Sequence, residues 1–181
     1  MGAQAQRVGP SLADAGPLTK LECVRDSWWS RDYDFLLDQA PCGSLEWERG
    51  WRAQAVGETG GRAWWIRRPG WFGTDVEIGP SGSEHRIAVF RRNFYSPDEI
   101  TFTDGRLFHW RRPRGFVLSM EWIMECEGAE LLSFTSTWSM LRPKVRIEIP
   151  ATRGLSADDL PILVFLGTYL FLQRLVSHGS A

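Results

Sequence analysis

The sequence predicts a mainly β protein, an antiparallel closed barrel of about twelve strands around a central C-terminal hydrophobic α-helix. Two observations support this prediction. From about residue 20 to residue 149 the chain reads as short strands separated by turns, with no helical pattern between them. The segment from Leu160 to Leu172 is apolar on every side, and such a helix must be surrounded by protein or lipid. A sheet that closes around this helix satisfies both observations.

Turn residues and alternating side chains define the predicted strands. Asp104-Gly105 favours a type I′ hairpin turn, because this turn needs positive φ angles. Val145, Ile147 and Ile149 alternate with charged residues, as in a sheet covered on one face. Further turns are expected at Pro41-Cys42-Gly43, Gly57 to Gly61, Pro69-Gly70, Gly79 to Gly82, Pro97-Asp98 and Gly128. We expect strands at residues 21–25, 33–38, 44–49, 51–56, 62–68, 74–79, 85–92, 99–103, 106–112, 116–126, 130–139 and 143–149.

The length of 181 residues fits one domain. We expect residues 1–16 to form a flexible leader and residues 17–181 to form the barrel, with a core helix at 157–176. Asp158 is the preferred helix cap, and Pro161 is tolerated in the first turn. Gly167 lies in the middle of the helix, where we expect a bulky side chain from the barrel wall, such as a tryptophan, to approach closely.

Composition and charge limit where the protein is expected to lie and what it is expected to bind. The apolar run of the helix is shorter than the roughly 20 residues of a membrane span, so an integral membrane protein is not expected. The net charge of −1 argues against wholesale electrostatic binding to nucleic acid or to a membrane, so any basic surface must be local, and nucleic acid is not expected as a partner. Three cysteines without a CxxC motif indicate reduced thiols. We expect a cytoplasmic monomer that can lie peripherally at the inner membrane surface.

No catalytic or metal-binding motif is present. The three histidines, His85, His109 and His178, do not stand at the spacing of metal ligands. A nucleophile elbow, a phosphate-binding loop and a dinucleotide fingerprint are absent. The prediction is a protein without metal, cofactor or enzymatic activity. An enzyme stays open as an alternative, and it would need His109 and a carboxylate together in a pocket.

Three arginine pairs form the candidate site. Each pair closes a predicted strand, and one further strand lies between successive pairs. In an up-and-down meander, alternate strands run in the same direction, so all three pairs should reach the same end of the barrel. Aromatic residues, among them Phe72 and Phe94, lie in the loops that follow. The candidate ligand-binding residues are Arg67, Arg68, Trp71, Arg91, Arg92, Tyr95, Arg111, Arg112 and Arg114.

Arginine forks suit phosphate and carboxylate groups, and exposed aromatic rings suit a membrane interface. These residues therefore predict recognition of anionic phospholipid headgroups or of an acidic protein. The alternative interpretation is that arginine ends these strands only as a solvated cation, neutralised by Asp75, Asp98 and Glu99.

The layout resembles the tubby C-terminal-like superfamily, which includes tubby proteins, phospholipid scramblases and LURP-one-related proteins. The matching features are the Asp104-Gly105 hairpin, the strand from Arg142 to Ile149 and the helical block from Asp159 to Leu170. The likeness is closest to small bacterial members of unknown role. It implies a closed barrel threaded by its last helix and a non-enzymatic binding module. Tubby proteins bind phosphoinositide headgroups through basic residues, but none of these aligns with a residue of this chain.

A different function would follow if the helix lay outside the barrel. The barrel would then have an open interior, and it could bind a small apolar ligand as lipocalins do.

Overall fold

The computed structural model describes residues 9–25, 32–48, 54–70, 73–113, 120–139, 142–150 and 155–178, with the backbone alone at 137–139, 142–143 and 176–178. Twelve antiparallel strands form a closed barrel in which each strand pairs with its neighbours in the sequence, and β1 pairs with β12. The predicted fold class is confirmed. The strands are β1 (Thr19–Arg25), β2 (Tyr33–Leu37), β3 (Ala40–Trp47), β4 (Ala55–Thr59), β5 (Arg62–Arg67), β6 (Val76–Pro80), β7 (Ala88–Arg91), β8 (Asp98–Phe102), β9 (Leu107–Arg111), β10 (Glu121–Cys126), β11 (Ala129–Ser139) and β12 (Arg142–Ile149).

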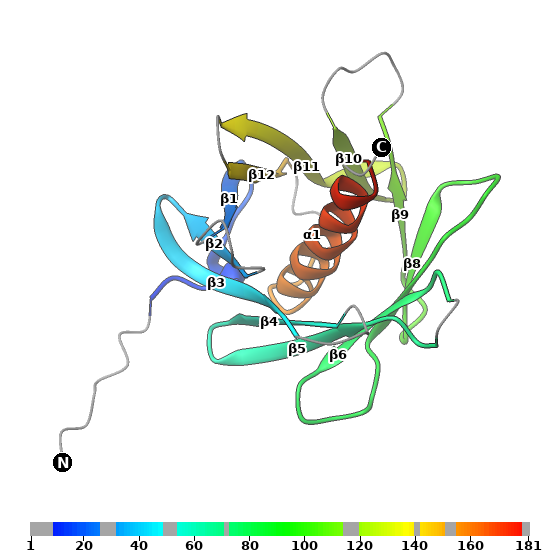
Figure 1. The fold of residues 1–181 in the computed structure, drawn as a ribbon. Coiled ribbons are helices and arrows are strands. Elements are labelled where there is room, and N and C mark those ends of the chain that lie inside the picture. Colours follow the sequence, from blue (N-terminus) through cyan, green and yellow to red (C-terminus); the bar gives the residue numbers. More distant parts are fainter. Residues whose placement is uncertain are drawn as a thin grey trace.

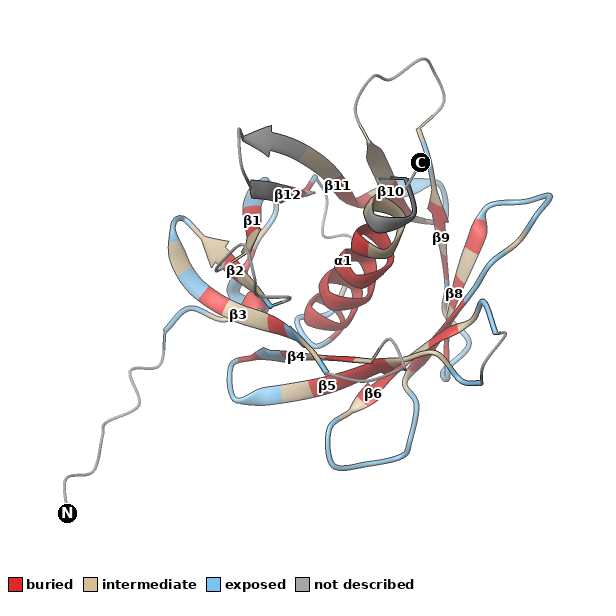
Figure 2. Ribbon diagram, in the orientation of Figure 1, coloured by how far each residue is buried: buried red, intermediate tan, exposed pale blue. Residues whose placement is uncertain are grey.

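The C-terminal helix α1 (Asp159–His178) lies inside the barrel (Figure 1). Every residue from Asp159 to Leu172 is buried, which explains why the helix has no polar face (Figure 2). Phe165 packs edge-on against Phe35 of β2, and Tyr169 stacks on Trp47 of β3. The lipocalin-like alternative, with the helix outside an open barrel, is therefore wrong. Within the described part of the chain, no helix is long and apolar enough to cross a membrane.

The predicted leader is wrong for residues 9–16, because part of this segment packs into the barrel. Ser11 caps a short 3-10 helix, η1 (Leu12–Asp14), in which Leu12 is fully buried. The Leu12 backbone N–H donates a 2.9 Å hydrogen bond to the hydroxyl of Thr59 in β4. Leu12, Ala15 and hydrogen bonds from Ser11 and Leu12 to the Thr59 hydroxyl hold the segment. Such a short element leaves no periodic pattern in a sequence. Residues 1–8 lie outside the described part.

Two predicted turns also differ from the structure. Pro41, Cys42 and Gly43 belong to β3, and the chain turns earlier, at Asp38 and Gln39, whose φ angles are +50° and +68°. The Asp104-Gly105 turn is present, but among its residues Gly105 alone has a positive φ, +91°. The Gly105 N–H donates to the Phe102 carbonyl and the Phe102 N–H donates to the Arg106 carbonyl. This pattern fits a three-residue loop with a left-handed glycine rather than type I′.

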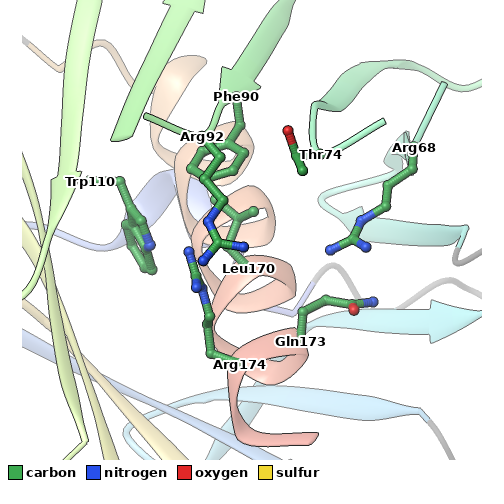
Figure 3. Close-up of a pocket in the computed structure, with 8 residues that line it drawn as sticks. All are labelled: Arg68, Thr74, Phe90, Arg92, Trp110, Leu170, Gln173 and Arg174. Carbon is green, nitrogen blue, oxygen red and sulfur yellow. The ribbon is translucent and has the colours of Figure 1, made fainter. Parts of the chain in front are cut away.

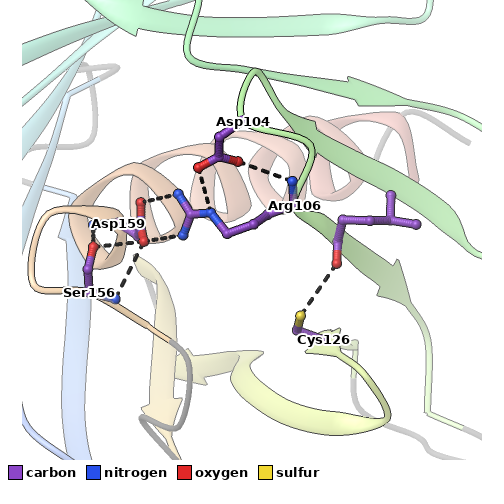
Figure 4. Close-up of polar contacts among 6 residues, drawn as sticks. Asp104, Arg106, Cys126, Ser156 and Asp159 are labelled. Carbon is purple, nitrogen blue, oxygen red and sulfur yellow. Dashed lines mark hydrogen bonds and ion pairs between the residues drawn. The ribbon is translucent and has the colours of Figure 1, made fainter.

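A polar cluster fixes the start of α1 at one end of the barrel, here called the cap end (Figure 4). The Ser156 hydroxyl accepts a hydrogen bond from the Asp159 N–H, while the Asp159 carboxylate accepts one from the Ser156 N–H. This reciprocal pattern is that of a capping box, so Ser156 and not the predicted Asp158 caps the helix. Arg106, from the β8–β9 hairpin, donates to both oxygens of Asp159. Asp158 instead pairs with Arg62 at the surface.

Replacing Asp159 with asparagine is expected to destabilise the fold at neutral pH by about 1–3 kcal/mol, since charged hydrogen bonds to a buried group are lost. Burial raises the pKa of Asp159, but the hydrogen bonds from Arg106 and Ser156 outweigh burial and lower the pKa below its usual value. The carboxylate therefore stabilises the fold above the unfolded-state pKa of about 3.9, and this contribution is lost as the pH falls through the lower folded-state pKa.

Urea denaturation of the wild type and of Asp159→Asn, at neutral pH and at acidic pH, measures this effect. The difference in unfolding free energy should narrow on acidification. Asp158→Asn is the matched control, because its ion pair is largely exposed and should contribute less than about 1 kcal/mol. Equal losses in the two variants at neutral pH would contradict the role given to Asp159.

Candidate anion-binding pocket

The three predicted arginine pairs lie at the same end of the barrel, opposite the cap end. Strands β5, β7 and β9 alternate with β6 and β8 in an antiparallel sheet, so they run in the same direction. Each of the three strands ends at the first arginine of its pair, which is Arg67, Arg91 or Arg111. The second arginine follows directly. We call this end of the barrel the pocket end.

The two arginines of each pair point to opposite faces, since successive side chains of a strand alternate. The first arginines lie on the outer surface, where each meets a carboxylate. Arg67 pairs with Glu77 and Glu84, Arg91 lies 4.0 Å from Asp75, and Arg111 donates a 2.7 Å hydrogen bond to Glu125. For these three arginines the interpretation as surface cations with acidic partners fits the structure.

Two of the second arginines, Arg68 and Arg92, turn toward the same pocket as Arg174 of α1 (Figure 3). The three guanidinium groups line a pocket of about 180 Å³. Phe90, Trp110 and Leu170 at its base are buried, whereas Thr74 and Arg92 at its mouth are exposed. The described residues that line the pocket are Arg68, Thr74, Phe90, Arg92, Trp110, Leu170, Gln173 and Arg174.

The pocket carries an excess of positive charge. Asp98 of β8 accepts a 3.3 Å hydrogen bond from Arg174. Among the residues that the structure describes, neither Arg68 nor Arg92 forms an ion pair. Burial lowers the pKa of Arg174 and the nearby Arg92 lowers it further, while Asp98 acts in the opposite direction. Three guanidinium groups around one carboxylate make the pocket electrostatically suited to an anion.

The base of the pocket also contains a hydrogen-bond donor that has no acceptor among the residues the structure describes. Trp110 is 1% exposed, and its indole Nε1 has no hydrogen-bond partner in the described part of the chain. In Figure 3 this nitrogen faces the side of the pocket where Arg92 and Arg174 extend toward each other. The Nε atom of Arg68, on the other side, is likewise buried and unpartnered. Indole and guanidinium groups only donate, so these side chains cannot satisfy one another.

Stacked rings support the wall behind Arg174. Trp110 stacks on Trp122 of β10 with their ring centroids 5.5 Å apart. The guanidinium carbons of Arg174 and Arg112 lie 5.1 Å and 5.9 Å from the Trp122 ring. Cation–π contacts of this kind hold an arginine in a defined place. The predicted site residue Arg112 is therefore near the pocket, although it does not belong to the lining.

Exposed aromatic side chains stand beside the pocket. Phe94 and Tyr95 lie in the loop between β7 and β8, and they are 81% and 104% exposed. The Arg92 guanidinium carbon lies 5.7 Å from the Phe94 ring centroid. This places the predicted Tyr95 near the mouth rather than in the lining. The predicted residues Trp71, Phe72 and Arg114 lie outside the described part of the chain.

His109 does not support the enzyme alternative. It is not among the residues that line the pocket, and its Nδ1 has no hydrogen-bond partner among the described residues. Its neighbours Phe108 and Trp110 point into the core, so His109 faces the outer surface. In the described part of the chain, no group of three or more histidine, cysteine or acidic residues could hold a metal ion.

Six of the described lining residues are absent from the predicted site: Thr74, Phe90, Trp110, Leu170, Gln173 and Arg174. Gln173 and Arg174 are the first polar residues after the apolar run of the helix. Because the helix is enclosed, its last turn delivers these side chains to the same end as the strand arginines. The sequence also offered a reason to consider Trp110, since it directly precedes Arg111-Arg112, the third arginine pair.

No family model, curated protein or solved structure matches this chain.

Proposed function

We propose that the protein is a non-enzymatic binding module that recognises an anionic group in the pocket of Arg68, Arg92 and Arg174. The observation that supports it best is a pocket lined by these three guanidinium groups, with a buried indole N–H at its base that has no acceptor among the described residues. A bound oxyanion would supply the missing acceptor and offset the positive charge. The barrel with a central helix also agrees with the tubby-like resemblance, and membership of that group is part of the proposal.

The ligand we favour is an anionic phospholipid headgroup at a membrane surface. Phe94 and Tyr95 support this choice, since they are exposed beside the pocket mouth. Aromatic side chains at such a position prefer the region between headgroups and acyl chains. A headgroup in the pocket and two rings in the interface would together hold the barrel on a membrane. An acidic segment of a protein is the competing ligand.

Removing the pocket arginines is expected to weaken binding to anionic vesicles strongly. Wild-type protein should sediment with vesicles of phosphatidylcholine and phosphatidic acid, and not with phosphatidylcholine alone. The double variant Arg68→Gln/Arg92→Gln should bind at least about tenfold more weakly, because hydrogen bonds to charged groups contribute about 1.5–3 kcal/mol each.

The outer arginines provide the matched control. Arg67→Gln/Arg91→Gln removes the same charge from adjacent positions of the same strands, and it should bind like the wild type. Equal losses in the two double variants would indicate non-specific attraction and contradict a pocket. Equal binding of the wild type to neutral and anionic vesicles would contradict the membrane proposal.

A further inference from the structure

The donors of the pocket outnumber the oxygens of a carboxylate. Each guanidinium of Arg68, Arg92 and Arg174 carries several N–H donors and no acceptor. The Trp110 indole adds one more donor, and the Thr74 hydroxyl can also donate. A carboxylate offers two oxygens, whereas a terminal phosphate group offers three strong acceptor oxygens. A ligand that satisfies this set needs more acceptor sites than a carboxylate has.

The charge of the pocket favours a dianion. Three guanidinium groups and the single carboxylate of Asp98 leave two positive charges without a negative partner among the described residues. A phosphate monoester carries close to two negative charges above its second pKa of about 6. A carboxylate or a phosphate diester carries one negative charge.

The size of the pocket limits what else can enter. Its volume of about 180 Å³ is below the roughly 300–1,000 Å³ of pockets that enclose drug-sized ligands. The arginines lie around a narrow interior whose base is closed by Phe90, Trp110 and Leu170. A diester phosphate carries a substituent on each side, so it cannot present three free oxygens to this base. A terminal phosphate can enter with its single substituent directed toward the mouth.

We propose that the pocket selects a terminal phosphate, a dianion with three free oxygens, over carboxylates and phosphate diesters. This inference rests on the proposed role of the pocket as an anion site. The ligand chemistry is a phosphate monoester, and two sources could present it: a lipid headgroup or a small soluble molecule.

Calorimetric titration at about pH 8 tests the selection with four small probes. Methyl phosphate is a dianion with three oxygens, methanesulfonate a monoanion with three, and acetate and dimethyl phosphate are monoanions with two free oxygens. We expect methyl phosphate to bind at least about tenfold more tightly than the other three probes. We expect Arg92→Gln to weaken its binding about tenfold or more, while Arg91→Gln leaves it unchanged.

Trp110→Phe tests the indole donor separately, because it removes the N–H and keeps an aromatic ring in the core. We expect a smaller loss for methyl phosphate, of about fivefold, with an unchanged circular dichroism spectrum. The wild type could bind all four probes with comparable affinity and Arg92→Gln could bind none of them. That result would overturn the selection of a terminal phosphate, while the anion site itself would stand. No binding of any probe to the wild type would overturn both.

Vesicles then distinguish the two sources. Phosphatidic acid presents a terminal phosphate and phosphatidylglycerol a diester. If the source is a lipid headgroup, the protein should bind the first in preference to the second, and methyl phosphate should compete. If methyl phosphate binds and neither vesicle does, the inference holds for a soluble phosphate monoester and the membrane proposal fails. Preference for phosphatidylglycerol vesicles would contradict the selection.

Discussion

Replacing Gly167 with leucine is expected to destabilise the barrel strongly. A Cβ atom at this position would lie 2.3 Å from Cζ of Phe134, far inside van der Waals contact. Phe134 is fully buried and its ring packs against Trp110 and Phe171, so it cannot move aside freely. Overpacking a core costs about 1–3 kcal/mol and sometimes more. Because leucine extends well beyond a Cβ, we expect a loss near the upper end of this range or above it.

Thermal and urea denaturation followed by circular dichroism measure the effect, with Gly16→Leu as the control. A Cβ at Gly16 would meet nothing within 4 Å. The smaller change Gly167→Ala should also destabilise, although alanine is favoured over glycine in a helix by about 1 kcal/mol. In the double variant Gly167→Ala/Phe134→Leu, part of the stability lost in Gly167→Ala should be restored, since leucine at 134 lacks the ring atoms that would clash with the new methyl group. A neutral or stabilising Gly167→Leu would contradict the enclosed helix.

The barrel could be predicted because its signals are local and repeated. Alternating residues such as Val145, Ile147 and Ile149 mark a sheet with one covered face, and all three are fully buried. The apolar run of the helix indicates enclosure, because no polar stripe is left for solvent. The close approach at Gly167 also follows from enclosure. The side chain that approaches Gly167 could not be predicted, and it belongs to Phe134 of β11 rather than to a tryptophan.

The common end of the arginine pairs could be predicted, but the different roles of the two arginines were missed. Strand direction alone brings all three pairs to one end. The face of each arginine depends on which strand residues point inward, and Trp64 and Trp65 are both apolar. In the structure Trp64 packs in the core, while the outer Trp65 donates a hydrogen bond to the Ser83 carbonyl. Such a doublet hides the alternation that would have separated Arg67 from Arg68.

The third arginine of the pocket could not be placed without the fold. Arg174 follows Arg92 by more than eighty positions in the sequence, and no local pattern joins them. They meet because the helix runs from the cap end to the pocket end inside the barrel (Figure 1). The salt bridge between Arg174 and Asp98 depends on the same three-dimensional path.

Phe165 is the second position where a single substitution should have a large effect. Its ring packs between β2 and β5, 5.3 Å from the Phe35 ring and 5.7 Å from the Trp64 ring. On the β4 side it lies against Gly57, where a Cβ atom would be 2.6 Å from the Phe165 ring. The helix and three strands thus meet at one fully buried aromatic side chain.

Phe165→Ala is expected to lower the free energy of unfolding by about 3–5 kcal/mol, the usual cost of removing a buried phenylalanine. For a chain of this size, that corresponds to a fall in Tm of roughly 6–20 °C. Phe94→Ala is the matched control, because it deletes the same atoms from an exposed loop and should change stability by less than about 0.5 kcal/mol. Gly57→Ala adds a coupling test, since the new methyl group should destabilise the wild type and be tolerated once the ring is removed. Additive effects of Gly57→Ala and Phe165→Ala, or a loss below about 1 kcal/mol for Phe165→Ala alone, would show that this ring does not join the helix to the barrel wall.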